Sequence, residues 1–193
     1  MIRAVAALSV MAVLAAAPAL AQPTPANAGY KTKVLDLIFH VEDMSGDVQS
    51  MSVKIASMVA KSKNIAVKVS RTEVRIELAA DVLFDFDSAE IQAKARQPLA
   101  RIAKFIGDSA KGQVQILGYT DGKGSAQYNQ GLSERRARSV ETWFVDKDGL
   151  RQVAFATQGM GMRDPVAPNT KPDGSDNPQG RAKNRRVEII IHK

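Results

Sequence analysis

Strand-like and helix-like patterns follow one another along residues 81–192, and their order restricts the fold more than any other feature of the chain. The segment DVLFDF (81–86) predicts a short strand, and apolar residues then recur at positions 99, 102, 103 and 106, one face of a helix. Further patterns predict a strand over 114–118, a helix over 126–145, a strand over 153–157 and a closing strand over 186–192. Because a helix that connects parallel strands crosses over with a right-handed sense, the order β-α-β-α-β-β indicates an α/β fold (an α+β sandwich) with helices on a mixed sheet.

The connections between these elements carry their own signals. Asp87 and Glu90 have the spacing of a capping box, and Pro98 lies just ahead of the apolar repeat, so we expect the first helix to begin near these residues. The glycine-bearing segment 119–125 is expected to be a tight loop that leads into the second helix. Residues 163–181 contain four prolines and predict a long irregular loop.

The first 21 residues are predicted to be a signal peptide. Arg3 gives a basic start, residues 4–17 are apolar, and Ala19 and Ala21 supply the small residues of a cleavage site. The alternative is an uncleaved membrane anchor, but Pro18 and the short apolar run favour cleavage before Gln22. Export would place the mature protein in the periplasm or beyond, which argues against a nucleic-acid partner.

Two segments precede the main domain. Residues 22–32 are predicted to be a Pro/Ala linker. Residues 33–78 are predicted to be a small β-rich extension, with a strand over 34–41, a short helix over 49–60 and a hairpin over 65–78. No chemistry is visible in this extension, and its role stays open. The main domain is expected to cover residues 79–193.

Composition excludes several classes of site. The chain has 193 residues, no cysteine, two histidines and a formal net charge of +7. Disulfides, thiol catalysis, thiolate metal sites and a lipidated cysteine are therefore excluded, and we expect no metal and no cofactor. The positive charge favours anionic partners.

The sequence also argues against an enzyme. Asp85, Asp87 and Glu90 form a carboxylate cluster, but capping explains two of them better than acid–base catalysis does. Ser133 and His192 have no spacing that supports a catalytic triad. The segment GYTDGKG lacks the Lys-Ser/Thr ending of a phosphate-binding loop. We expect no catalytic residues.

The constellation with the most chemistry lies around the start of the second helix. Asn129, Leu132 and Arg136 are three and four residues apart and share one helix face, and Asp121 lies in the preceding loop, close to free main-chain N–H groups. A carboxylate, a guanidinium and these donors would suit a zwitterion that carries both an ammonium and a carboxylate group. On spacing alone, a structural salt bridge between Asp121 and Arg136 with Leu132 in the core remains the stronger interpretation.

The stretch GYTDGKGSAQYNQGLSERRARSVETWFV (118–145) closely resembles the OmpA-like peptidoglycan-binding domain family, whose pattern is TDxxGxxxxNxxLSxxRAxxV. The matching positions are Thr120, Asp121, Gly124, Asn129, Leu132, Ser133, Arg136, Ala137 and Val140. Two more family blocks occur in the same order, VLFDFDSAEI (82–91) upstream and segments of 159–189 downstream. The resemblance covers about residues 79–193.

The resemblance implies non-covalent binding of peptidoglycan through the diaminopimelate residue of its stem peptide. Asp121 and Arg136 would hold that residue, with help from Thr120, Asn129 and Leu132. Phe84 and Asp85, near the FDFDS turn, would be further contacts. Arg185 is expected to buttress the sheet or the site.

The expected protein is therefore a non-enzymatic component of a Gram-negative cell envelope, in the periplasm, with association to the outer membrane left open. An alternative is an envelope adaptor that binds a protein partner through residues 33–78 and uses the wall domain as an anchor. A cell-wall hydrolase is a weaker alternative. The sequence does not decide whether the chain forms a homodimer.

Overall fold

The computed structural model describes residues 65–110 and 112–192. The predicted signal peptide, the linker, and the strand and helix expected over 34–60 lie outside the described residues. Within the described ranges, no helix is long and apolar enough to cross a bilayer.

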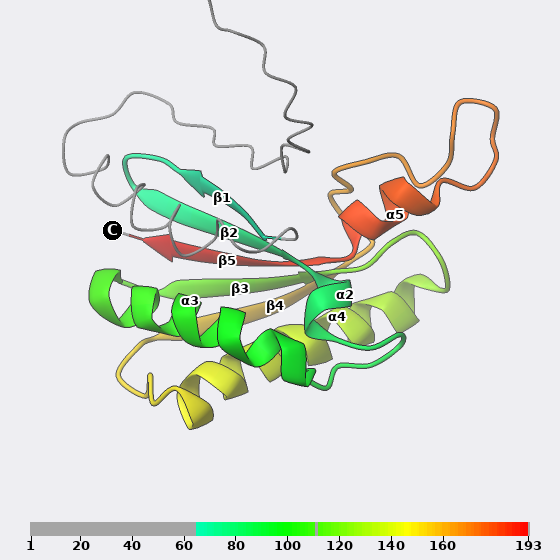
Figure 1. Cartoon of the computed structure of the whole chain (residues 1–193). Coiled ribbons are helices and arrows are strands. Elements are labelled where there is room, and N and C mark those ends of the chain that lie inside the picture. The colour runs from blue at the N-terminus through cyan, green and yellow to red at the C-terminus, as the bar shows by residue number, and fades with distance from the viewer. Residues whose placement is uncertain (1–64, 111, 193) are drawn as a thin grey trace, which may run out of the picture. The chain divides into compact units, whose positions relative to one another are not determined.

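In the described residues the sheet has five strands, β1 (Ile65–Val69), β2 (Glu73–Ala79), β3 (Val114–Tyr119), β4 (Phe155–Gly161) and β5 (Arg186–His192). Their spatial order is β1-β2-β5-β3-β4. β5 pairs antiparallel with both β2 and β3, whereas β3 and β4 are parallel. The sheet is therefore mixed, with its last strand in the middle (Figure 1).

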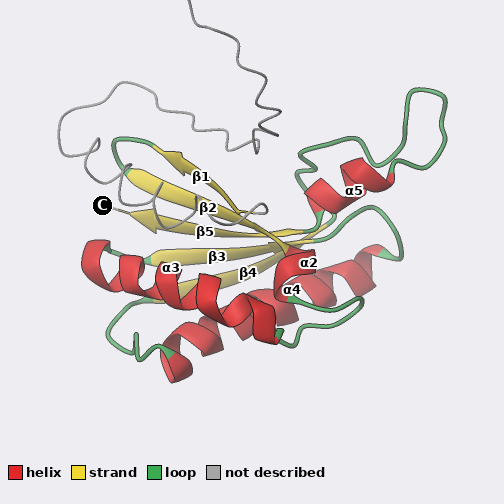
Figure 2. Ribbon diagram, viewed as in Figure 1, coloured by secondary structure: helices red, strands yellow, loops and turns green. Residues whose placement is uncertain are grey.

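The helices are α2 (Ala80–Leu83), α3 (Arg96–Ser109), α4 (Ala126–Thr142) and α5 (Pro178–Asn184). A 3-10 turn, Ala93–Ala95, precedes α3, and a π-helical turn, Trp143–Lys147, continues α4. α3 and α4 lie along the same side of the sheet (Figure 2). α4 connects the parallel strands β3 and β4, which is the predicted crossover.

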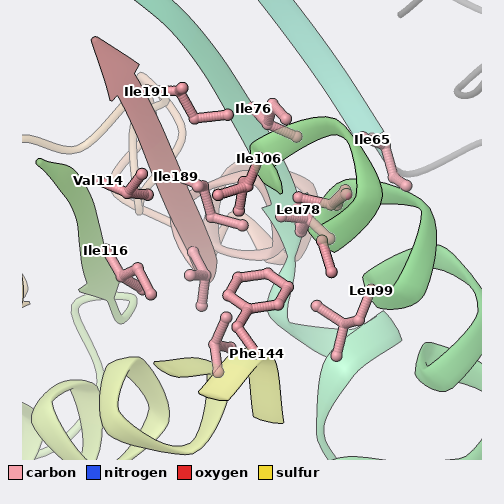
Figure 3. Packing of buried hydrophobic residues seen from close by; sticks show 14 of the residues in the cluster. Ile65, Ile76, Leu78, Leu99, Ile106, Val114, Ile116, Phe144, Ile189 and Ile191 are labelled. Atoms are coloured by element: carbon pink, nitrogen blue, oxygen red, sulfur yellow. The ribbon is translucent and has the colours of Figure 1, made fainter. Parts of the chain in front are cut away.

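Period-two alternation in the strands creates the core. Val67 lies opposite Ile76, Ile76 opposite Ile189, and Ile189 opposite Ile116, so one apolar row runs across four strands. Leu99 and Ile106 of α3 and Phe144 after α4 belong to the same buried cluster (Figure 3). Each of these three side chains is fully buried. Burial on this scale contributes about 1.5–3 kcal/mol for each large apolar side chain.

α4 approaches the sheet unusually closely because glycines face it. A Cβ added to Gly118 would lie 2.3 Å from the carbonyl oxygen of Ser133, and one added to Gly159 would lie 2.6 Å from the amide nitrogen of Glu134. The Ser133 hydroxyl accepts a hydrogen bond from the Gly161 amide at 2.9 Å. Gln130 Nε2 donates to the Gly159 carbonyl at 2.8 Å. These contacts fix where the first turns of α4 stand relative to the end of β3.

The predicted order of strands and helices is confirmed, with the first strand in a different place. The first strand of the order is β2, Glu73–Ala79, and the strand predicted over 81–86 is wrong. There the chain forms the four-residue helix α2 and then extended backbone at Phe84. The predicted hairpin over 65–78 is present as β1 and β2, and it belongs to the same sheet as β5.

Three other local expectations differ from the structure. Asp87 does not cap a helix, because it has φ 58° and α3 begins only at Arg96. β4 begins at Phe155 and extends to Gly161, beyond the predicted end at 157. The loop expected over 163–181 ends in α5, which Asn177 caps by accepting from the Gly180 amide at 3.1 Å.

Candidate functional site

A cleft of about 570 Å³ lies at the end of the sheet where β3 leads into α4. α2, α5 and the loop before α4 meet at this end of the molecule (Figure 1). The walls come from the turn after α2, from the end of β3, from the first three turns of α4 and from α5. The residues that line the cleft are Asp81, Phe84, Asp85, Phe86, Asp87, Gln92, Lys94, Thr120, Asp121, Lys123, Tyr128, Asn129, Leu132, Arg136, Pro178, Arg181 and Arg185.

All seven residues that the sequence singled out line this one cleft. They come from three elements, and the structure brings them together as Phe84, Asp85, Thr120, Asp121, Asn129, Leu132 and Arg136. Their contacts differ, and the contacts separate side chains that are available to a ligand from those that shape the cleft.

Asp121 is held by two arginines that approach from the end of the chain. Its Oδ2 accepts a hydrogen bond from Arg185 Nη1 at 2.9 Å and lies 3.6 Å from Arg181 Nη1. Its Oδ1 accepts from the Lys123 amide at 3.0 Å. Asp121 as a residue is 8% exposed, and it lines the cleft. Asp121 therefore pairs with Arg181 of α5 and with Arg185 at the C-terminal end of α5, whereas spacing alone suggested a salt bridge with Arg136.

Arg185 connects two carboxylates at the cleft, those of Asp81 and Asp121. Its Nε and Nη2 donate to the two carboxylate oxygens of Asp81 at 3.1 and 2.7 Å, while Nη1 holds Asp121. The hydrogen bond to Asp81, assisted by the one to Asp121, raises the pKa of Arg185 above its ordinary value. Because the guanidinium is shared by two carboxylates, Arg185 sets the orientation of the Asp121 side chain.

Arg136 is a buried cation with a different kind of environment. It is 5% exposed, its Nε donates to the Ser88 carbonyl at 2.8 Å, and its guanidinium carbon lies 5.2 Å from the centre of the Phe84 ring. In the part of the chain that the structure describes, no carboxylate lies within 4.0 Å of it. Burial lowers its pKa from the ordinary value, since removal from water disfavours the charged form. A carboxylate ligand would supply the missing counter-charge.

Asn129 and Thr120 shape the cleft. Asn129 Nδ2 donates to the carbonyls of Lys123 and Ser125 at 2.7 and 3.2 Å, which ties the entering loop to α4. The Thr120 amide donates to the Gly161 carbonyl at 2.8 Å, and its buried Oγ1 has no partner among the described residues. Leu132 is 6% exposed and forms an apolar part of the wall. The side-chain NH₂ group of Asn129 is thus bonded to the loop.

The turn after α2 forms the opposite wall. Phe84 is 2% exposed and supports Arg136, while Asp85 is exposed and its Oδ1 accepts from Gln92 Nε2 at 2.8 Å. The Ser88 amide donates to the Asp85 carbonyl at 3.1 Å, which closes the turn. The two predicted residues of this turn therefore have structural contacts in addition to their place on the cleft.

Sequence reasoning missed Arg181, Phe86 and Tyr128. Arg181 grips Asp176 with Nε and Nη2 at 2.9 and 2.7 Å and also reaches Asp121. Arg181 and Arg185 are four residues apart, a spacing that aligns side chains on a helix. That spacing is present in the sequence, but the four prolines of 163–181 favour a loop there. The exposed aromatic residues carried no signal that distinguished them from core residues.

Comparisons with known proteins show which protein family the chain resembles. The model of the OmpA family matches residues 83–179. Outer membrane protein A of Citrobacter freundii is 39% identical over 123 residues, which cover 59% of this chain and 50% of that protein. The Photosystem I P700 chlorophyll a apoprotein A2 of Gloeobacter violaceus is 45% identical over 118 residues, 61% of this chain and 13% of that protein. This chain thus spans half or less of the length of these two relatives.

A solved structure has the same architecture. The cell wall anchor of the T6SS from Pseudomonas aeruginosa is 30% identical, with a TM-score of 0.60, over 71% of this chain and 95% of that one. The family match includes the turn after α2, the end of β3 and the whole of α4, which build most of the cleft. The chain belongs to the OmpA family.

Proposed function

We propose that the protein binds peptidoglycan non-covalently by holding the diaminopimelate residue of the stem peptide in the cleft beside α4. The observation that carries this proposal is the presence, in one cleft, of an oriented carboxylate at Asp121 and a buried cation at Arg136 that has no carboxylate within 4.0 Å among the described residues. Membership of the OmpA family and likeness to a cell wall anchor support it.

The binding mechanism follows from the two charges. The free carboxylate of diaminopimelate pairs with Arg136, and its ammonium group pairs with Asp121. Asp121 keeps its negative charge in place because Arg185 and the Lys123 amide hold both of its oxygens. Hydrogen bonds to charged groups are worth about 1.5–3 kcal/mol each. Since the cleft is open to water, we expect weak binding to one stem and firm retention on a polymer that repeats it.

The protein would then act as a non-catalytic anchor or integrity factor of a Gram-negative envelope. The predicted signal peptide would carry it to the periplasm, and the mature chain would start near Gln22. The net positive charge would favour its association with the anionic stems.

The experiment that tests this function is co-sedimentation with purified sacculi. Wild-type protein should pellet with diaminopimelate-type sacculi, far less with lysine-type sacculi, and should be released by free diaminopimelate. Arg136→Met should abolish pelleting. Arg135→Met, an exposed neighbour on the same helix that does not line the cleft, removes the same charge and should leave pelleting unchanged.

Two results would contradict the proposal. Equal binding to both types of sacculi would remove diaminopimelate as the recognised group. Soluble muropeptides released from the sacculi during incubation would indicate a hydrolase.

A further inference from the structure

The two arginines that hold Asp121 are each bound more firmly to a second, outer carboxylate. Arg185 donates from Nε and Nη2 to both oxygens of Asp81, at 3.1 and 2.7 Å. Arg181 donates in the same way to both oxygens of Asp176, at 2.9 and 2.7 Å. Each guanidinium thus places two parallel N–H groups, the arrangement that fits a carboxylate best, on an outer aspartate. The remaining nitrogen, Nη1, is the one that approaches Asp121.

Asp121 keeps the capacity to accept another donor because of this arrangement. Both Nη1 atoms approach its Oδ2, that of Arg185 at 2.9 Å and that of Arg181 at 3.6 Å. Its Oδ1 accepts from the Lys123 amide at 3.0 Å. The two oxygens of a carboxylate offer about four lone-pair sites. Oδ1 can therefore accept an ammonium group of a ligand while both arginines stay where they are.

The outer aspartates also leave an excess of negative charge around Asp121. The charged group consists of the carboxylates of Asp81, Asp121 and Asp176 and the guanidinium groups of Arg181 and Arg185. Three negative and two positive charges give this group a net charge of −1. Lys123 Nζ lies 3.8 Å from Asp176 on an exposed side chain, where water screens its charge. Without either outer carboxylate the group would be neutral, and a cationic ligand would no longer be attracted to it.

We infer that Asp81 and Asp176 are positioning residues that make the cleft select a ligand group with an ammonium charge. This inference rests on the proposed function. Asp176 does not line the cleft, so it acts through Arg181, as Asp81 acts through Arg185. An arginine that loses its outer carboxylate turns its two parallel N–H groups onto Asp121. That pairing occupies Oδ1 and neutralises the carboxylate that the ammonium needs.

The test compares two ligands on the whole chain by titration calorimetry. One is a stem tripeptide with diaminopimelate, and the other is the same peptide with a hydrogen in place of the ammonium group of that side chain. Wild-type protein should prefer the first. Asp81→Asn and Asp176→Asn should each weaken binding of the first by about three- to tenfold, the effect of a partly lost charged hydrogen bond. Neither should weaken binding of the second, which carries only negative charges.

Controls separate positioning from structure and from overall charge. Asp81→Glu keeps the outer charge and should keep most of the preference. Asp108→Asn removes a carboxylate of similar exposure, 62% against 58% for Asp81, from an ion pair with Lys104 away from the cleft, and should change neither affinity. In an Arg181→Met background, Asp176→Asn should have no further effect, because no guanidinium remains to turn onto the carboxylate.

The outcomes separate this inference from the proposed function. If wild-type protein prefers the diaminopimelate peptide and both Asn variants keep that preference, the inference is overturned and the proposed function stands. Equal losses for both peptides, or the same loss in Asp108→Asn, would overturn it too, since they indicate a structural or an overall charge effect. If wild-type protein binds neither peptide, or binds both equally, the proposed recognition of diaminopimelate fails and this inference fails with it.

Discussion

Asp121 and Arg136 carry opposite charges, and the protein compensates them differently. Asp121 has Arg185 and Arg181 within 2.9 and 3.6 Å, whereas Arg136 has one hydrogen bond to a carbonyl and no carboxylate within 4.0 Å among the described residues. A buried charge without a partner costs stability. In the proposed function, the buried charge of Arg136 lowers the stability of the free protein and attracts the carboxylate of the ligand.

This difference leads to a prediction about stability. Arg136→Met loses a charge-assisted hydrogen bond and also the cost of a buried cation, so we expect the free energy of unfolding to change by less than about 1 kcal/mol. Asp121→Ala leaves two arginines facing each other without their shared carboxylate and should cost about 1–3 kcal/mol. Both should abolish sacculus binding. Thermal unfolding beside the pelleting assay checks this, and a collapsed melting temperature for Arg136→Met would identify Arg136 as a structural residue.

Asp148, at the end of the π-helical turn, yields a prediction about pH. Burial raises the pKa of its carboxyl group against the opposing effect of the Trp143 indole, and its Oδ2 has no hydrogen-bond partner among the described residues. A folded-state pKa above the unfolded value means that stability is greatest below the unfolded pKa and is lost as pH rises through the folded pKa. Asp148→Asn should therefore raise the melting temperature at about pH 7 and lose that advantage at about pH 3.

Unfolding scans of both proteins across this range give the measurement. An advantage of Asp148→Asn that grows toward low pH would show that the carboxylate stabilises the fold.

At the scale of elements, the contact between α4 and the sheet sets the geometry of the cleft. Gly118 and Gly159 leave room for the backbone of Ser133 and Glu134, which are rigid neighbours. One turn further along, the same helix carries Arg136. Any residue that pushes α4 off β3 and β4 would therefore also move Arg136 relative to Asp121.

Gly118→Ala tests this coupling. Its Cβ would stand 2.3 Å from the Ser133 carbonyl oxygen, so the helix must shift, at a cost of about 1–3 kcal/mol. We expect a lower melting temperature and weaker sacculus binding together. Gly112→Ala is the control, because its Cβ would make an ordinary contact at 3.9 Å with His192. A Gly118→Ala protein with unchanged stability would show that the close approach is dispensable.

The elements that sequence patterns predicted well are those with long, regular alternation. The closing strand over 186–192 agrees with β5 because Val187, Ile189 and Ile191 all face the core. The strand predicted over 81–86 is wrong because the segment begins with a single helical turn. That turn buries Ala80 and Leu83 and is too short to show a helical period. The end of β4 escaped detection because its buried positions are Gly159 and Gly161, which carry no apolar side chain.

At the scale of the whole molecule, the sequence predicts the part of the site whose residues belong to one motif. Thr120, Asp121, Asn129, Leu132 and Arg136 lie within 17 positions of one another, and they do line one cleft. The partners of Asp121 were not predictable from spacing, because Arg185 lies 64 positions away and meets it only through the pairing of β5 with β3. Exposure of Phe86 depends likewise on the folded turn.

The N-terminal residues carry a prediction about the whole chain in the cell. We expect the mature protein to start near Gln22, because Ala19 and Ala21 form the proposed cleavage site. It should fractionate as soluble periplasmic material together with a wall-bound fraction. N-terminal sequencing of both fractions provides the measurement. An intact Met1 in the inner-membrane fraction would favour a membrane-anchored protein instead.

The central position of β5 has a consequence for how the chain reaches its folded state. β1 and β2 on one side and β3 and β4 on the other are joined in the sheet only through β5, whose residues are made after all of theirs. Pairings between distant segments form late and slowly. A chain threaded N-terminus first through an export channel would therefore stay translocation-competent until residues 186–192 emerge. In an exported chain, the sheet would therefore close only after these residues have crossed the membrane.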